Sequence, residues 1–581
     1  MILTQQSVLE KLTFLYGEER GAACYTRLMA RLDAFRQENP ALAAQPHDPA
    51  RRVTERDAIL ITYGDSLQED DQPPLRTLHR FLREHLHGVL STVHILPFFP
   101  YSSDDGFSVI DYLRVDPALG DWADIQQLGA DFRLMFDAVI NHISAHSAWF
   151  QAFKAGDPAY REFFITVDPA ADLSCVVRPR TLPLLTPVET PAGIEHVWTT
   201  FSDDQIDLNF ASEDVLLRII DVLLFYVAQG ASFIRLDAIA YLWKEIGSSC
   251  IHLPQTHAVV QLFRAVLDLV APQVSIISET NVPHVENMSY FGDGANEAQM
   301  IYQFTLPPLT LHAFITGDAS QLSAWAAGIE PVSASATYFN FTASHDGIGV
   351  RPVEGILPPG EVQKLIERAQ AHGGAVSYKH NSDGTQSPYE LNINYFDALS
   401  DPAEDEPRAV QVQRFLASQA IMLAFVGVPG IYIHSLLGSR NWNAGVQQTG
   451  RLRTINREKL HRDDVQAALS DPDSLRSRVF NAYRHLLAVR TRERAFHPTA
   501  AQTVLDLDPA LLALRRTAPD GSEQIVALHN VANRTVTLPP GALPAEQGAL
   551  YRDVISGVAH DPRRALSVPP YGVLWLKAEQ P

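Results

Sequence analysis

The stretch ASFIRLDAIA, residues 231–240, places an arginine and an aspartate two positions apart inside an apolar run. In a β-strand, residues i and i+2 point to the same face, so Arg235 and Asp237 share one environment, whereas Ile234 and Leu236 point away from it. Such a pair is either a structural ion pair or part of a functional site. The remainder of the chain decides between these two interpretations.

The same pattern, a short apolar run that ends in polar residues and precedes a helix-like segment, recurs from residue 57 onward. The eight runs are DAILITYGD (57–65), GVLSTVHILPFFP (88–100), FRLMFDAVINH (132–142), ASFIRLDAIA (231–240), VSIISETN (274–281), MIYQFTLPP (300–308), ATYFNFTASHD (336–346) and VPGIYIHSLLG (428–438). Segments between them, such as 74–86 and 255–271, have apolar residues at helical spacing. Strands that alternate with helices predict a parallel sheet, and eight of them predict a (β/α)8 TIM barrel.

Two gaps between these runs are too long for simple crossovers, and they are rich in Pro, Asp, Ser and Gly. Beyond about residue 490, ALLALRRT and EQIVALHN flank Pro519-Asp520-Gly521, which predicts an antiparallel hairpin. We therefore predict an α/β protein with five parts. They are an N-terminal helical extension (1–56), the catalytic barrel (57–142 and 213–489), a subdomain inserted after the third strand (143–212), a loop subdomain inserted after the seventh (347–408), and a C-terminal antiparallel β domain (490–581).

The composition limits the partners and the location of the protein. A net charge of −21 over 581 residues repels polyanions, so we expect neither nucleic acid nor a membrane as a partner. The three cysteines are far apart and match no metal motif, the N-terminus does not resemble a signal peptide, and the apolar stretch Ala420–Ile433 is too short to span a bilayer. We expect a cytoplasmic protein with small-molecule substrates. A homodimer is one arrangement consistent with the sequence.

Polar side chains gather at the ends of the predicted strands, which is where the active sites of TIM barrels lie. These side chains belong to Asp104, Asp137, Asn141, His142, Arg235, Asp237, Glu279, His345 and Asp346. Each alone has a structural explanation, such as a turn residue or a core histidine. Because burying so many charges for structure alone is costly, we interpret them together as a ligand-facing site.

The residue types at this site favour chemistry carried out by carboxylates. The sequence has no GxSxG elbow, no Gly-rich phosphate loop and no HExxH helix. Asp237 and Glu279 follow adjacent strands and suit a retaining reaction at an acetal, which needs two carboxylates about 5–5.5 Å apart. Arg235 would keep Asp237 ionised as the nucleophile, and burial would raise the pKa of Glu279 so that it acts as a general acid.

Four of these motifs, DAVINH, FIRLDA, the Glu of IISETN, and ASHDGIG, resemble in their order the signature regions of the α-amylase superfamily, glycoside hydrolase family 13. Further stretches, among them VHILPFFP, RPRTLPLLTP and YQFTLPPLTLHA, resemble the sucrose phosphorylase branch over roughly residues 57–490. The length, the leading helical extension and segments such as FFPYSSDDGFSVIDY are most similar to the glucosylglycerate phosphorylases of that branch.

This resemblance implies a role for each matching residue. Asp237 would be the nucleophile, Glu279 the acid/base and Asp346 the third carboxylate, which stabilises the transition state. The glucosyl-binding residues would be Asp104, Phe107, His142, Arg235, Tyr241, His345 and Glu390. The residues for phosphate or the acceptor would be Arg178, Arg180, Arg453 and Lys379, with Lys379 or Arg180 as candidates for a glycerate carboxylate. Surface ion pairs are the alternative role for the arginines.

The sequence departs from the pattern of sucrose-acting members at two acceptor-facing positions. Glu390 stands where those enzymes have glutamine, and Asn281 stands where they have histidine, which favours an acceptor other than fructose. The Lys-His pair that follows the nucleophile in many amylases is replaced by Ile239-Ala240, so we predict no metal and no other cofactor.

The resemblance therefore implies an enzyme, a retaining phosphorylase. It would transfer an α-glucosyl group from glucosylglycerate to inorganic phosphate through a covalent glucosyl-Asp intermediate, giving α-D-glucose 1-phosphate and glycerate reversibly. Three alternatives stay open: phosphorolysis of glucosylglycerol, sucrose or sucrose 6-phosphate; a retaining α-glucoside hydrolase or transglucosylase; and an inactive sugar-binding module on the same fold.

Overall fold

The computed structural model describes residues 2–45, 47–179, 182–381, 384–543 and 550–579. All eight predicted barrel strands are confirmed, and each is parallel to its neighbours in a closed barrel of order β1-β16-β12-β11-β10-β9-β4-β3. The strands are β1 (Ile59–Thr62), β3 (Thr92–Ile95), β4 (Arg133–Ala138), β9 (Ala231–Leu236), β10 (Ser275–Ser278), β11 (Met300–Tyr302), β12 (Thr337–Asn340) and β16 (Val428–Tyr432).

The barrel strands are continuous apolar runs because helices cover them from outside and side chains fill them from inside. Every residue of β1, β3, β10, β12 and β16 is buried. The covering helices include α4 (Pro74–His85), α5 (Trp122–Asp131), α7 (Glu213–Ala228), α8 (Pro254–Val270), α10 (Leu306–Thr316), α11 (Ser320–Ala327), α14 (Arg408–Ala424) and α18 (Leu475–Arg490). The two helices expected over 74–86 and 255–271 are therefore confirmed as α4 and α8.

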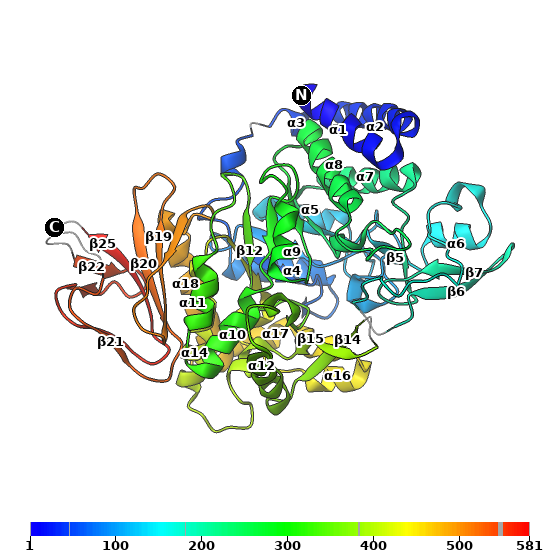
Figure 1. Ribbon diagram of the computed structural model, residues 1–581. Coiled ribbons are helices and arrows are strands. Elements are labelled where there is room, and N and C mark those ends of the chain that lie inside the picture. Colours follow the sequence, from blue (N-terminus) through cyan, green and yellow to red (C-terminus); the bar gives the residue numbers. More distant parts are fainter. Residues whose placement is uncertain (1, 46, 180–181, 382–383, 544–549, 580–581) are drawn as a thin grey trace.

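The two long gaps form small structures that extend from the ends of β4 and β12 (Figure 1). The first contains α6 (Ala148–Lys154), the hairpin β6 (Leu185–Thr190) and β7 (Gly193–Trp198), and the pair β5 (His142–Ser144) and β8 (Gln205–Asp207). The second contains a three-stranded sheet of β13 (Ile348–Gly349), β15 (Gln386–Asn392) and β14 (Ala375–His380), with α12 (Pro359–Ala371) beside it. Both insertions carry residues of the site described below.

The C-terminal part is an antiparallel β domain, as predicted, and lies to one side of the barrel (Figure 1). Its six-stranded sheet has the order β18-β19-β20-β25-β22-β23. These strands are β18 (Ala501–Val504), β19 (Leu511–Thr517), β20 (Gln524–Asn530), β22 (Leu550–Asp553), β23 (Ala559–His560) and β25 (Val573–Glu579). The expected hairpin across Pro519-Asp520-Gly521 is formed by β19 and β20. The domain limits drawn from the sequence stay a prediction.

The N-terminal helices α1 (Ile2–Tyr16) and α2 (Glu18–Glu38) pack on the outside of the barrel against α7 and α8 (Figure 1). The Tyr16 hydroxyl donates a hydrogen bond to the Phe210 carbonyl at 2.9 Å, and Arg20 pairs with Glu213 at the start of α7. Across the described residues, no helix is both long and apolar enough to cross a membrane.

Candidate active site

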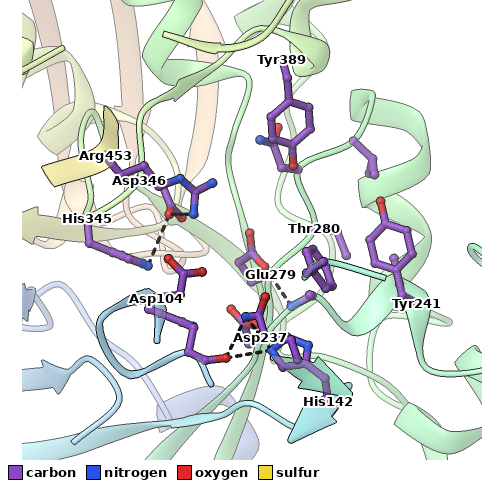
Figure 2. Close-up of a pocket in the computed structure, with 17 residues that line it drawn as sticks. Asp104, His142, Asp237, Tyr241, Glu279, Thr280, His345, Asp346, Tyr389 and Arg453 are labelled. Carbon is purple, nitrogen blue, oxygen red and sulfur yellow. Dashed lines mark hydrogen bonds and ion pairs between the residues drawn. The ribbon is translucent and has the colours of Figure 1, made fainter. Parts of the chain in front are cut away.

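A pocket opens at the carboxyl ends of the barrel strands, where the sequence predicted the site. Figure 2 shows Asp237 and Glu279 close together at the barrel end, with Asp346 and Arg453 to one side of them and Tyr241 to the other. The residues that line the pocket are Asp104, Phe107, His142, Phe201, Gln205, Asp237, Ala238, Ala240, Tyr241, Glu279, Thr280, Asn281, Val282, His345, Asp346, Tyr389 and Arg453.

Asp237 lies one residue beyond the end of β9 and is held by Arg235 of the same strand. The Arg235 guanidinium donates to the Asp237 carboxylate at 2.8 Å and also to Asp137 at the end of β4. Asp137 in turn is 2.6 Å from the Nε2 of His94 on β3. Burial alone would raise the pKa of Asp137, but Arg235 and His94 hold it below its ordinary value. Three adjacent strands thus fix the guanidinium that orients Asp237.

Glu279 lies one residue beyond β10, beside Asp237 on the neighbouring strand. Its carboxylate accepts a hydrogen bond of 2.9 Å from the backbone N–H of Ala238, which has a left-handed conformation with φ of 47°. This strained turn aims the amide that follows Asp237 at the carboxylate of Glu279. The two carboxyl groups are therefore joined both through Arg235 and through one backbone amide.

The two carboxyl groups differ in how closely Arg235 approaches them. Burial raises the pKa of both, and Arg235 opposes that rise. The guanidinium makes a direct hydrogen bond to Asp237, whereas its nearest nitrogen is 3.8 Å from the Glu279 carboxylate. The pKa of Glu279 rises to about 7. A proton shared by the pair therefore resides on Glu279, which leaves Asp237 as the anion.

Asp346 approaches the pocket from the loop after β12 and lies beside two arginines and the neutral ring of His345. Arg453 contacts its carboxylate at 2.6 Å, Arg457 at 3.7 Å and His345 at 3.5 Å. Burial alone would raise the pKa of Asp346, but Arg453 and Arg457 hold it well below its ordinary value. Asp346 is thus an anion across the physiological pH range.

Glu390 does not line the pocket and instead supports Arg453 from behind. Its buried carboxylate accepts a hydrogen bond of 2.7 Å from Arg453 and another from the backbone N–H of Gly347, next to Asp346. Arg453 is therefore held between two carboxylates, Asp346 and Glu390. This arrangement fixes Asp346 and leaves Arg453 with little charge to offer a substrate.

Aromatic rings and histidines form the floor of the pocket. Phe107 and His345 stack with ring centroids 4.8 Å apart, and burial lowers the pKa of His345 to about 3, so this ring is neutral. His142 Nε2 lies 2.8 Å from the Phe107 carbonyl and 3.1 Å from the Gln205 amide. Asp104 has a left-handed φ of 53°, a conformation that aspartate adopts more readily than most other residues.

The structure brings most of the predicted site residues together. Those in the pocket lining are Asp104, Phe107, His142, Asp237, Tyr241, Glu279, His345, Asp346 and Arg453. Arg235 and Glu390 lie directly behind it. Arg178 and Lys379 are not in the lining: Arg178 donates to the carbonyl of Leu182 at 2.9 Å, and Lys379 lies on β14. Arg180 lies outside the described residues. The individual roles of these residues stay a prediction.

Sequence reasoning did not select several residues of the pocket wall, chiefly Phe201, Gln205, Thr280 and Tyr389. Phe201 and Gln205 come from the insertion after β4, and Tyr389 comes from β15 in the insertion after β12. Their positions depend on how the insertions fold back over the barrel, which no strand-end pattern reveals. A signal was nevertheless present for Tyr389, which directly precedes Glu390 in SPYELN.

Comparisons with known proteins agree with this geometry. The catalytic-domain model of the alpha-amylase family matches residues 87–346. A glucosylglycerate phosphorylase of Spirochaeta thermophila is 51% identical over 98% of this chain and 97% of its own. The glucosylglycerate phosphorylase of Escherichia coli is 44% identical over 99% of this chain and 100% of its own. The crystal structure of a sucrose 6F-phosphate phosphorylase from Thermoanaerobacter thermosaccharolyticum covers 82% of this chain and 94% of its own, with 24% identity and a TM-score of 0.71, which supports the fold.

The barrel, the carboxylate pair at its mouth and these matches define a glycoside-processing enzyme of the TIM-barrel class. The chain belongs to the α-amylase family, glycoside hydrolase family 13, as its sequence motifs predicted. Within that family, both of the sequence relatives described above are named glucosylglycerate phosphorylases.

Proposed function

We propose that this protein is a retaining glucosylglycerate phosphorylase. It transfers an α-glucosyl group from glucosylglycerate to inorganic phosphate and releases α-D-glucose 1-phosphate and glycerate. The observation that carries this proposal is the carboxylate pair, Asp237 and Glu279, joined by one guanidinium and one backbone amide at the barrel mouth. Near full-length identity to relatives of that name supports the choice of substrates.

In the first half-reaction, the Asp237 carboxylate attacks the anomeric carbon of the bound glucosyl group. The bond from that carbon to the glycerate oxygen breaks, and the proton on Glu279 passes to this oxygen. Arg235 keeps Asp237 anionic and aimed, and the pKa of about 7 lets Glu279 carry its proton at neutral pH. Asp346 stabilises the positive charge that develops on the sugar. The product is a glucosyl ester on Asp237.

In the second half-reaction, a phosphate oxygen attacks the same carbon and the ester bond to Asp237 breaks. The proton of the attacking phosphate passes to Glu279, which is now a general base, and the enzyme returns to its starting state. Two inversions at one carbon retain the α configuration. A hydrolase would use the same carboxylates, so the acceptor that intercepts the ester distinguishes the two activities.

We also propose a cytoplasmic location. Cys24, Cys175 and Cys250 are all free thiols in the structure, as a reducing compartment would keep them. Both phosphate and the two products are small anions for which the enzyme needs no macromolecular partner.

The experiment that tests the function measures glucose 1-phosphate and free glucose released from four donors, with and without inorganic phosphate. The donors are glucosylglycerate, glucosylglycerol, sucrose and sucrose 6-phosphate. We expect glucose 1-phosphate to appear with phosphate and glucosylglycerate. Free glucose at a rate that does not depend on phosphate would identify a hydrolase, and preference for another donor would change the acceptor.

A further inference from the structure

A second cavity adjoins the catalytic pocket on the side of Arg453. It has a volume of about 340 Å³ and shares four wall residues with the catalytic pocket. These are Asp104, Phe201, Gln205 and Arg453. Because the same four residues line both spaces, the two cavities are adjacent, and the second lies where the other half of a substrate would extend from a glucosyl ring in the catalytic pocket. The cavity is therefore a candidate for the acceptor subsite.

The cavity is basic although the protein is acidic. Three arginines, Arg451, Arg453 and Arg457, line it, and Asp104 is the one carboxylate among its lining residues in the described chain. The protein as a whole carries a net charge of −21. A local cluster of arginines in such a chain attracts small anions to one place and leaves the rest of the surface repulsive to them.

Two of these arginines are already engaged by carboxylates. Arg453 pairs with Asp346 at 2.6 Å and with Glu390 at 2.7 Å. Arg457 pairs with Asp105 at 2.6 Å, and its carbon stem is buried. Since both guanidinium groups are largely neutralised, neither is well placed to bind a further anion as its main partner.

Arg451 differs from the other two arginines of the cavity. It is exposed, and it directly precedes the 3-10 helix η7 (Leu452–Asn456) that carries Arg453. Within the ranges that the structure describes, its side chain makes no ion pair and no hydrogen bond. Its planar guanidinium therefore keeps all its donors available for a bidentate contact with a carboxylate or a phosphate.

We propose that Arg451 is the anion anchor of the acceptor subsite, and that it binds the glycerate carboxylate and inorganic phosphate in turn. This inference rests on the proposed function. In a double displacement, the leaving group and the second nucleophile occupy the same side of the anomeric carbon, one after the other. A single cation beside that position thus serves both anions. Arg453, in contrast, is a positioning residue that fixes Asp346.

The test uses the full-length protein and the variant Arg451→Ala, with Arg563→Ala as a matched control. Arg563 is an exposed arginine of the C-terminal domain whose guanidinium contacts Asp561 at 2.8 Å, so the control removes the same charge far from the barrel mouth. Michaelis constants are measured for phosphate in phosphorolysis, and for glycerate and uncharged glycerol as acceptors of the glucosyl group of glucose 1-phosphate. Hydrolysis of α-glucosyl fluoride reports the carboxylates alone.

We expect Arg451→Ala to raise the KM for phosphate and for glycerate by about tenfold or more, the scale of one charge-assisted contact. The KM for glycerol and the hydrolysis of α-glucosyl fluoride should stay within about twofold of wild type. Unchanged KM values for both anions would overturn the proposal, as would a rise for only one of them. The same would follow if Lys379→Ala, and not Arg451→Ala, produced the effect.

Failure of the proposed function can be told apart from failure of this inference. If the wild-type protein does not use glycerate, the function is wrong, yet the KM for phosphate still tests Arg451. If the wild type uses both anions and Arg451→Ala has unchanged KM values for phosphate and glycerate, the proposed function stands and Arg451 is not the anion anchor.

Discussion

Buried arginines occur at both ends of the barrel, and they have different partners. At the mouth, Arg235 is 1% exposed and contacts the carboxylates of Asp137, Asp237 and Glu279. At the junction with the C-terminal domain, Arg516 is fully buried, and its hydrogen-bond partners among the described residues are the backbone carbonyls of Ala424, His497 and Ala500. Both groups are hydrogen-bonded, so burial alone does not distinguish a catalytic arginine from a structural one.

The surroundings affect the pKa values of these two arginines in opposite directions. Burial alone would lower the pKa of Arg235, but Asp137 and its other anionic neighbours raise it well above the ordinary value. Burial, together with the charge of the nearby Arg490, lowers the pKa of Arg516 to about 9. Carboxylate partners hold negative charge where a reaction can use it, whereas carbonyl partners only fix two backbone segments together. We therefore expect substitutions around Arg235 at the barrel mouth to lower turnover, and substitutions of Arg516 at the junction to lower stability.

Replacement of the nucleophile, Asp237, should have the greatest effect on turnover. Asp237→Asn has nearly the same volume and cannot form the glucosyl ester, so kcat should fall by about 10⁴-fold or more. The melting temperature should stay within a few degrees of wild type, because Arg235 keeps Asp137 and Glu279 as partners. Steady-state rates and thermal unfolding check the two parts. Turnover within tenfold of wild type would remove Asp237 as the nucleophile.

A second change at the mouth separates the acid from the nucleophile. Glu279→Gln removes the proton donor and should lower kcat for glucosylglycerate by about 10²–10⁴-fold. Formation of the ester from α-glucosyl fluoride should be affected far less, because fluoride needs little protonation to leave. Rates with the two donors, compared in one preparation, measure the difference. Equal losses with both donors would argue against Glu279 as the general acid.

Most residues of the candidate active site at the barrel mouth could be predicted from the sequence. Strand alternation places Arg235 and Asp237 on one face, and the parallel barrel brings the end of each strand to the same rim, so the carboxylates follow from the pattern alone. Glu390 and Arg451 could not be placed in this way. The fold of the insertion after β12 and of the segment before η7 decides whether a charge there meets a carboxylate or an open cavity.

The junction was the less predictable region. In ALLALRRT, the two arginines at 515 and 516 resemble the polar end of a strand, and alternation sends only one of them inward. The carbonyl partner of Arg516 at Ala424 lies 92 residues earlier in the chain. Local sequence carries no information about a partner at that distance, so the role of Arg516 becomes visible only once both domains are in place.

Substitution of Arg516, the buried arginine at the junction, should affect stability and not turnover. Arg516→Met has a similar volume but removes the side-chain donor from all three carbonyls, of which that of His497 keeps the Ala500 N–H, so the free energy of unfolding should fall by about 2–4 kcal/mol. The kcat at 25 °C should remain near that of wild type. Arg515→Met, at the next and partly exposed position of β19, is the matched control. Denaturant unfolding checks the stability, and a loss of activity without a loss of stability would contradict the structural role.

A smaller effect, the pH dependence of kcat/KM, can be measured on the wild-type protein. Glu279 acts as an acid only while protonated, and burial raises its pKa to about 7. The kcat/KM for glucosylglycerate should therefore decline by about tenfold per pH unit above that pH. It should be constant just below it, and fall again at acidic pH once Asp237 takes up a proton. With α-glucosyl fluoride the alkaline decline should be weak, because its leaving group needs little proton transfer, and Glu279→Gln should remove the decline altogether. By linkage, the raised pKa of Glu279 lowers the unfolding free energy as pH rises from the ordinary value of 4.5 to about 7, and adds little further change above that pH. The unfolding free energy should therefore not follow the same curve as kcat/KM. If kcat/KM declined at alkaline pH with both donors and also in Glu279→Gln, the group that titrates would not be Glu279. The raised pKa of Glu279 would then not control the rate of glucosyl transfer.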